Sequence, residues 1–144
     1  MTLEEIAALW QEDVNIDKAE LGDEALKIPK LHHKYYQVLI HEKLLLKKYE
    51  ANMKTLKLEK YEFYSQGPTD ETRRKGWELP AKGLILKSDL PMYIDADKDI
   101  INQSLKIGLQ QEKIIYLDSI IKTIMHRGYL IKSAIEWNRF TMGG

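Results

Sequence analysis

Two long stretches of the chain repeat apolar residues at heptad spacing, a pattern typical of long helices that pack against a partner helix. Residues 31–65 contain neither Gly nor Pro, and successive apolar positions lie 3, 4 or 7 residues apart. Two charged residues, Glu42 and Lys60, interrupt this seam. The pattern predicts one continuous helix with the seam residues Tyr35, Leu39, Leu46, Tyr49, Met53, Leu56 and Phe63.

A second heptad seam predicts a helix over residues 98–126. Leu105, Leu109 and Ile120 lie outside this seam, so the helix carries two apolar faces. Both faces have to be buried, and a chain of 144 residues offers few surfaces of its own. The pattern therefore favours packing between subunits as well as within one. The seam consists of Ile100, Ile107, Ile114, Leu117, Ile121 and Ile124.

Shorter elements precede the first long helix. Thr2 and Glu5 have the spacing of a capping box, which predicts a helix that begins directly after Thr2. Asp17 is a candidate cap for a second short helix, which Pro29 ends or turns. Residues 1–30 hold eight acidic and three basic residues, so we expect an acidic helical arm.

Breaker residues and short apolar runs divide the rest of the chain. A Gly-Pro pair ends the first long helix, and residues 66–83 are polar, which predicts a loop. Residues 84–86 and 92–94 are short apolar runs that predict a pair of edge strands. The Arg-Gly pair at 127–128 resembles a helix C-cap, so a separate last helix is expected over 129–140.

These elements predict a mainly α-helical protein in which the long helices pack as a hairpin or bundle. We expect one domain of residues 1–144, because this length and a hydrophobic fraction of 44% suffice for one core. The absence of cysteine excludes disulfides, thiolate zinc sites and thiol nucleophiles, and it fits a reducing cytosol. The expected segments are the arm 1–30, the long helix 31–65, the loop and extended segment 66–97 and the oligomerisation helices 98–140.

The net charge of zero conceals a basic middle. Residues 31–64 carry seven basic and four acidic residues. On a helix, several of these cations and one aromatic residue fall within an arc of about 80° beside the seam. Cations interleaved with aromatic rings are what binding of single-stranded DNA requires, although the same stripe could be the solvated side of a coiled coil. The stripe consists of Lys43, Lys47, Lys54, Lys57 and Tyr61, and Arg73, Arg74, Lys75 and Trp77 follow it in the loop.

Catalytic motifs are missing from the sequence. The acids Asp95, Asp97 and Asp99 lack the glycine and the later acid of an EF-hand, because Ile100 and Lys106 stand at those positions. Capping of the helix over 98–126 explains either Asp97 or Asp99 more simply. No P-loop, Gly-x-Ser-x-Gly or His-Glu-x-x-His sequence occurs. We expect no catalytic residue, no metal and no cofactor. A magnesium-dependent nuclease is the weakest alternative.

Short sequences in a particular order and spacing, over nearly the full length, resemble the UvsY family of recombination mediators from T4-like phages. No single one of them is as specific as a nucleotide-binding motif, and their order carries the resemblance. They are the opening Met1-x-Leu3-Glu4, Asp13-Val14, Ile16-Asp17, Lys34, the run from Leu56 to Ser65, Ala96-Asp97-Lys98-Asp99, Ser104-Leu105, Arg127-Gly128 and Ile131-Lys132.

The resemblance implies a function without catalysis. Such proteins bind single-stranded DNA, contact the single-strand-binding protein and a RecA-like recombinase, and help the recombinase to assemble a presynaptic filament. They form ring-shaped homo-oligomers of about six or seven subunits. They act in phage recombination and in recombination-dependent replication and repair, which places them in the cytoplasm of the infected host and not in a membrane.

The family's DNA-binding motif has two basic residues two positions apart, ahead of an aromatic-aromatic-Ser sequence. Lys60 stands at the second position, whereas Leu58 replaces the first. The stripe adds candidates, among them Tyr61 as a ring that stacks on a base, while Tyr64 is expected to pack under the 66–83 loop. The candidate DNA-binding residues are Lys54, Lys57, Lys60, Tyr61, Arg73 and Arg74.

Oligomerisation is expected to depend on the apolar residues of the C-terminal helices. The main alternative function is an oligomeric helical adaptor that recruits proteins through its acidic arm without binding DNA. The candidate oligomerisation residues are Ile114, Leu117, Ile121, Ile124, Ile131 and Ile135.

Overall fold

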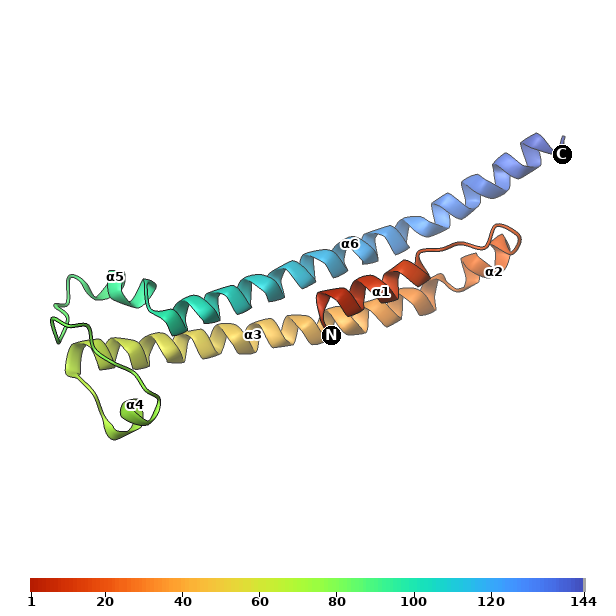
Figure 1. The fold of residues 1–144 in the computed structure, drawn as a ribbon. Coiled ribbons are helices and arrows are strands. Elements are labelled where there is room, and N and C mark those ends of the chain that lie inside the picture. The colour runs from red at the N-terminus through yellow and green to blue at the C-terminus, as the bar shows by residue number, and fades with distance from the viewer. Residues whose placement is uncertain (144) are drawn as a thin grey trace. The chain divides into compact units, whose positions relative to one another are not determined.

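A computed structural model describes residues 1–143 of the chain, and every regular element in this range is a helix. Two of the helices are long, as the heptad patterns predict (Figure 1). The contacts divide the chain into unit 1, Met1–Leu44 with Gln111–Gly144, and unit 2, Leu45–Gln110. The helices are α1 (Leu3–Asp13), α2 (Leu21–Leu26), α3 (Ile28–Gln66), α4 (Asp70–Arg74), α5 (Leu90–Asp95) and α6 (Lys98–Thr141).

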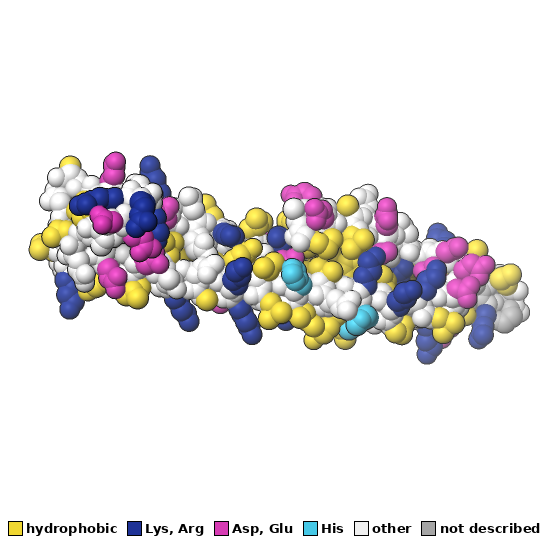
Figure 2. Space-filling model, turned by 90° about the horizontal axis from the view of Figure 1, so that it is seen from below, with side chains coloured by type: hydrophobic (Ala, Val, Ile, Leu, Met, Phe, Trp, Pro, Cys, Tyr) yellow, Lys and Arg dark blue, Asp and Glu magenta, His cyan; other side chains and the backbone are white. Residues whose placement is uncertain are grey.

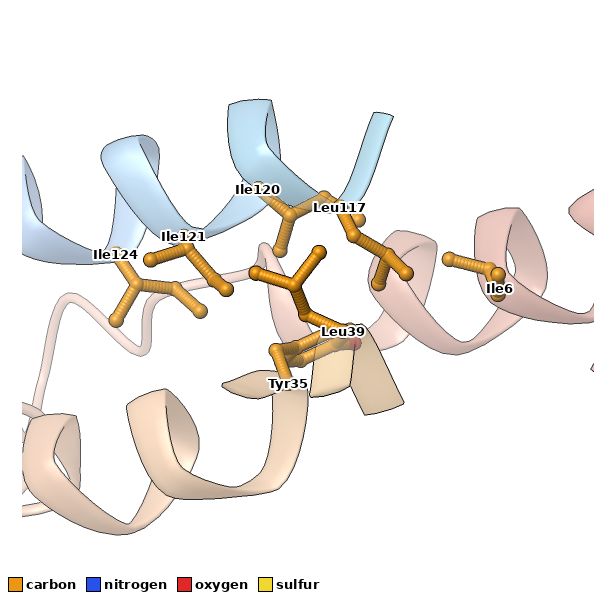
Figure 3. Close-up of a cluster of buried hydrophobic side chains, with 7 residues drawn as sticks. All are labelled: Ile6, Tyr35, Leu39, Leu117, Ile120, Ile121 and Ile124. Carbon is orange, nitrogen blue, oxygen red and sulfur yellow. The ribbon is translucent and has the colours of Figure 1, made fainter. Parts of the chain in front are cut away.

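The core of unit 1 forms where α1 packs against α3 and α6 (Figure 3). Thr2 caps α1 with the predicted capping box, since its hydroxyl accepts from the Glu5 amide and Glu5 accepts from the Thr2 amide. Trp10 of α1 meets Tyr35 of α3 edge to face, with ring centroids 5.4 Å apart. The buried core residues are Ile6, Tyr35, Leu39, Leu117, Ile120, Ile121 and Ile124.

A buried arginine connects the N-terminal arm to α6 in unit 1. Arg127 is 5% exposed and donates to the carbonyl oxygens of Asp13 (2.7 Å) and Asn15 (2.8 Å) and to the Glu24 carboxylate (3.3 Å). Asp13 in turn accepts from Lys34 and from the Tyr35 hydroxyl. A buried charge is tolerated only when it is paired and hydrogen-bonded, so these contacts fix the arm to the long helices.

The core of unit 2 packs the C-terminal end of α3 against the segment between α4 and α6. Gly67 ends α3 with a φ of 98°, a left-handed conformation that glycine adopts readily. The chain then returns, and the Ile85 amide donates to the Tyr64 carbonyl at 3.0 Å. Phe63, Tyr64, Ile85 and Leu90 form the buried cluster, with Trp77, Leu79, Tyr93 and Ile94 packed around it.

The structure corrects three expectations for local structure. The edge-strand prediction is wrong, because residues 84–86 lie in irregular structure and α5 occupies the second run. The helix break at 127–128 is wrong, because α6 continues to Thr141 while Arg127 is held by tertiary partners. Pro29 does not end α2, which stops at Leu26. It lies in the first turn of α3, where a backbone N–H has no acceptor within the helix, so the N–H that proline lacks is not missed.

Two smaller expectations also change. Asp17 does not cap α2, which begins at Leu21; its carboxylate accepts from the Ala19 amide in the preceding turn. The expected 66–83 loop contains the short helix α4, which Thr69 caps through Thr72. Neither α3, α6 nor any shorter helix among residues 1–143 combines the length and the apolar character that crossing a membrane demands.

The candidate oligomerisation residues lie mostly inside the chain's own core. Leu117, Ile121, Ile124 and Ile131 are buried, and the other two candidates are half-buried. Their part in assembly therefore stays a prediction. The apolar side chains that α6 exposes are different ones, among them Ile115, Met125, Tyr129, Leu130, Trp137 and Phe140.

We predict that unit 1 loses stability in acid through Glu24. A hydrogen bond from Lys27, with a further one from Arg127, outweighs the effect of burial and holds the pKa of Glu24 below its usual value. A carboxylate whose pKa is lowered by folding stabilises the protein at pH values above its unfolded pKa of about 4.3, and that stabilisation is lost as pH falls further. Thermal melts between pH 7 and pH 3 should show it.

Glu24→Gln should melt earlier at pH 7 and should show a weaker decline in melting temperature on acidification. Glu12→Gln, at an exposed position of α1, is the matched control and should behave like the unmodified chain. An unchanged acid dependence in Glu24→Gln would contradict the prediction.

Candidate nucleic-acid interface

Helix α3 presents an exposed basic face in unit 2. Lys47, Lys54 and Lys57 are exposed, and among residues 1–143 none of them has an acidic partner within 4.0 Å. Tyr61 lies in the same arc one turn further on and is 39% exposed. These ammonium groups are accessible to a ligand because no ion pair among residues 1–143 holds them.

A shallow groove borders Lys57. Its lining comes from α3, α5 and α6 and combines the apolar side chains of Met53, Ile101 and Leu105 with the acid Asp95 of α5. Ile101 and Leu105 are 43% and 68% exposed. The groove therefore places apolar surface, suited to the flat face of a base, beside a cation suited to a phosphate.

Helix α4 places two of the predicted residues on the surface among acids. Arg73 pairs with Asp70 at 3.5 Å, and the Arg74 Nε donates to the Asp70 carbonyl at 3.4 Å. Lys75 pairs with Glu59 and Glu71, and these partners raise its pKa. Basic and acidic side chains are accordingly mixed where α4 lies (Figure 2). Both arginines remain exposed and accessible, and Asp70 offsets part of the charge of Arg73.

Lys60 lies in a different environment from the other predicted cations. It is 3% exposed, and its ammonium pairs with Asp97 at 3.1 Å and with Asp99 at 2.8 Å. The same ammonium lies 3.7 Å from the centroid of the Trp77 ring, within the range of a cation–π interaction. The structure therefore separates Lys60 from the exposed face that carries Lys54 and Lys57.

Asp97 joins this buried cluster to the start of α6. One carboxylate oxygen accepts from the amides of Asp99 (2.9 Å) and Ile100 (3.2 Å), so Asp97, of the two candidate caps Asp97 and Asp99, is the one that caps α6. The other oxygen accepts from the Tyr64 hydroxyl at 2.6 Å and from Lys60. Burial alone would raise the pKa of Asp97, but these hydrogen bonds hold it below its usual value, so the carboxylate is charged at neutral pH.

The two tyrosines near the end of α3 differ as expected. Tyr64 is buried among Phe63 and Tyr93, and burial together with its bond to Asp97 raises its pKa. Tyr61 stays at the surface, and its ring takes part in no aromatic or cation–π contact among the described residues. Its predicted stacking on a base is therefore compatible with the fold and stays a prediction.

The histidines and acids do not converge on a metal. Within residues 1–143 no group of three or more His, Asp or Glu side chains is arranged to hold one. Asp97 and Asp99 face a lysine instead, as the capping interpretation of these residues allows.

A long-helix scaffold that carries an exposed, unpaired cationic face defines a candidate nucleic-acid-binding protein. The family model described as recombination, repair and ssDNA binding protein UvsY matches residues 9–144. The chain belongs to the UvsY family.

Crystal structures of the bacteriophage T4 recombination mediator protein UvsY are similar to this fold. One aligns with a TM-score of 0.78 and 20% identity over 98% of this chain and 99% of that chain. Another aligns with a TM-score of 0.77 and 25% identity over 100% of this chain and 99% of that chain. Comparison with curated protein sequences gives no match.

Two features of the site were not predicted from the sequence. One is that Asp97 binds Tyr64 and Lys60 while it caps α6; the other is the contact of Trp77 with Lys60. Lys60 did carry a signal for its burial, since it interrupts the heptad seam at a position that faces inward.

We predict that Tyr64 and Tyr61 differ in their effect on stability. Tyr64→Phe removes a buried hydrogen bond to a charged carboxylate, so the free energy of unfolding should fall by about 1.5–3 kcal/mol. Tyr61→Phe changes an exposed hydroxyl and should stay within about 0.5 kcal/mol of the unmodified chain. Urea unfolding followed by circular dichroism measures both, and equal effects of the two substitutions would refute the assignment.

Proposed function

We propose that the protein is a recombination mediator that binds single-stranded DNA and helps to load a RecA-like recombinase onto DNA covered by single-strand-binding protein. It would act in phage recombination, recombination-dependent replication and repair, in the cytoplasm of the infected host. The observation that carries the proposal is the exposed face of Lys47, Lys54 and Lys57 on a member of the UvsY family; within residues 1–143 these lysines form no ion pair.

DNA binding would rest on phosphate contacts. Lysines spaced along one side of a helix can follow a flexible backbone without reading its sequence, so binding should be independent of sequence and sensitive to salt. Tyr61, beside these lysines, would add stacking of a base, worth about 1–3 kcal/mol. Arg73 would contribute less, because Asp70 of the same short helix pairs with it at 3.5 Å, and the Nε of Arg74 already donates to the Asp70 backbone carbonyl.

Assembly would multiply these contacts. A protomer offers few phosphate contacts, but a ring of about six or seven copies would repeat them and raise the effective concentration of sites along one strand. The exposed apolar side chains near the end of α6, among them Trp137 (64%) and Phe140 (77%), are surface that such an assembly could bury. A monomeric mass in light scattering would argue against the ring.

The loading step would follow from how the strand is held. A strand bound at several points is bent or wrapped, and a cooperative single-strand-binding protein holds a distorted strand less well. The recombinase would then nucleate on the freed segment. No catalytic side chain is needed for these steps, since they exchange one set of phosphate contacts for another.

An oligomeric adaptor that recruits proteins without touching DNA is the alternative. The exposed acids of residues 1–30 would then be its docking surface, and it predicts no retention on single-stranded DNA at low salt. What favours the DNA-binding proposal over the adaptor is membership of a family whose model is described as ssDNA binding, together with exposed lysines that can reach phosphates.

We predict that Lys54→Ala with Lys57→Ala weakens binding to oligonucleotides of any sequence. Each lost contact with a single strand should reduce the slope of log affinity against log salt by about 0.7. Fluorescence anisotropy at several salt concentrations measures the slope. The same variant should lose its stimulation of recombinase assembly on DNA covered by single-strand-binding protein.

The matched control is Lys48→Ala with Lys87→Ala. It removes the same charge from two exposed positions of unit 2 that lie outside the stripe. If both double variants weaken binding equally, net charge rather than this face explains the affinity. If neither weakens it, the adaptor alternative gains.

We also predict that Leu58→Lys strengthens binding. Leu58 is 59% exposed on α3 and stands where the family motif has its first basic residue. A lysine there should leave stability within about 0.5 kcal/mol and steepen the salt slope by about 0.7. Leu58→Gln, which removes the apolar side chain without adding charge, should leave the slope unchanged. A slope in Leu58→Lys equal to that of Leu58→Gln would show that position 58 does not reach a phosphate.

A further inference from the structure

Lys60 differs from the other candidate DNA-binding residues because its ammonium group is surrounded by partners within the protein. Two N–H groups of the ammonium face carboxylate oxygens of Asp97 and Asp99, and the Trp77 ring covers it at 3.7 Å. A lysine ammonium has three donors, so nothing remains for an incoming phosphate without breaking a contact. Its side chain is also 4% exposed, whereas Lys54 and Lys57 are exposed.

The charges around Lys60 also oppose an anion. Two carboxylates face one ammonium, so the three groups together carry one negative charge. Asp99 is the outer member, with 48% of its side chain exposed, and a phosphate that approached Lys60 would meet it first. Lys60, Asp97 and Asp99 line a pocket on the surface of unit 2. Two further cations line the same pocket: Lys75, which is paired with Glu59 and Glu71, and Lys98.

The contacts of Lys60 link three segments of unit 2. Lys60 belongs to α3, and Asp97 caps α6. Trp77 lies three residues after the end of α4, and its amide donates to the carbonyl of Thr72 in α4 at 3.1 Å. Trp77 also contacts Phe63 of α3, with ring centroids 5.6 Å apart. Loss of the ammonium would leave two unbalanced carboxylates and free one face of Trp77.

We propose that Lys60 is a positioning residue: it joins α3 to the start of α6 and to Trp77, and thereby holds the α4 segment with Arg73 and Arg74 against α3, without contacting DNA. This inference rests on the proposed function, because DNA binding by the neighbouring lysines supplies the comparison. It removes Lys60 from the set of phosphate contacts to which the family motif assigns it.

Acetylation of lysines in the unmodified protein tests the proposal without any substitution. The protein is treated with acetic acid N-hydroxysuccinimide ester with and without an oligo-dT strand. Lys54 and Lys57 should be acetylated in the free protein and protected when DNA is bound. At the reagent concentration that acetylates half of Lys54 and Lys57 in the free protein, Lys60 should stay unmodified in both samples. Modification of Lys60 at the rate of Lys57, with protection by DNA, would overturn the proposal.

The acetylation pattern also separates the two proposals. If no lysine is protected by oligo-dT, the proposed function fails, while an unreactive Lys60 still supports its buried role. If Lys54 and Lys57 are protected but Lys60 reacts freely, DNA binding stands and the positioning role fails.

A charge-compensated pair of variants gives the second test. Lys60→Met should lower the melting temperature and weaken DNA binding. Lys60→Met with Asp97→Asn has the same net charge as the unmodified chain, and Asn keeps an oxygen for capping α6. It should regain melting temperature and DNA affinity, with a salt slope that differs from the unmodified slope by less than the value of about 0.7 expected for one phosphate.

The emission of Trp77 supplies an independent readout. In a Trp10→Phe/Trp137→Phe background it should shift to the red in Lys60→Met and return in the compensated variant. A compensated variant that melts normally but has lost about 0.7 from the salt slope would show that Lys60 contacts a phosphate. Lys60→Met with unchanged melting and emission would equally overturn the positioning role. Should the compensated variant not fold, the acetylation experiment decides alone.

Discussion

Burial of charge along the two long helices is the constraint on which the rest of the structure depends. A charge removed from water destabilises the fold unless a partner of opposite sign meets it in good geometry. In unit 1, Glu42 at 0% exposure faces the α-amino group of Met1 at 3.2 Å and Lys113 at 3.8 Å, and Arg127 faces Glu24. In unit 2, Lys60 faces Asp97. Each pair joins segments far apart in sequence, so a shift of one segment against the other would leave a buried charge without its partner.

This constraint also separates the charges that hold the fold from those left for a ligand. The buried charges are paired with groups of opposite sign, and no buried side-chain nitrogen or oxygen among the described residues lacks a hydrogen bond. What remains available on α3 of unit 2 are lysines on the adjacent arc, which have no acidic partner within 4.0 Å among residues 1–143 although Glu50 lies on the same arc. Under the proposed function this division would matter, because phosphates can leave exposed lysines without any loss of core contacts.

The heptad pattern was sufficient to predict α3 and α6, since a sustained apolar period over many turns has few other interpretations. It could not predict the segment between them. Residues 84–86 and 92–94 are too short for periodicity to distinguish strand from helix. Contacts with the aromatic end of α3 bury Ile85 of the first run, and Tyr93 and Ile94 of the second run pack against the same cluster. The prediction that a helix ends at the Arg-Gly pair 127–128 was wrong for a similar reason. Helix capping is a local rule, whereas Arg127 is held by three acceptors from the N-terminal arm, so α6 continues through the glycine.

The sequence also predicted only part of the candidate site correctly, and Lys60 shows why. The stripe of lysines followed from helical geometry alone, and its members in unit 2 are exposed. Lys60 was added from a family motif, although the heptad arithmetic already placed it between Leu56 and Phe63 on the inward seam. Of the two motif positions, the outward one holds Leu58, at 59% exposure, and the inward one holds Lys60, at 3%. A basic residue can therefore recur in a motif for two different physical reasons. Which face of the helix it occupies, rather than its place in the motif, determines whether its charge reaches a phosphate or balances a buried aspartate.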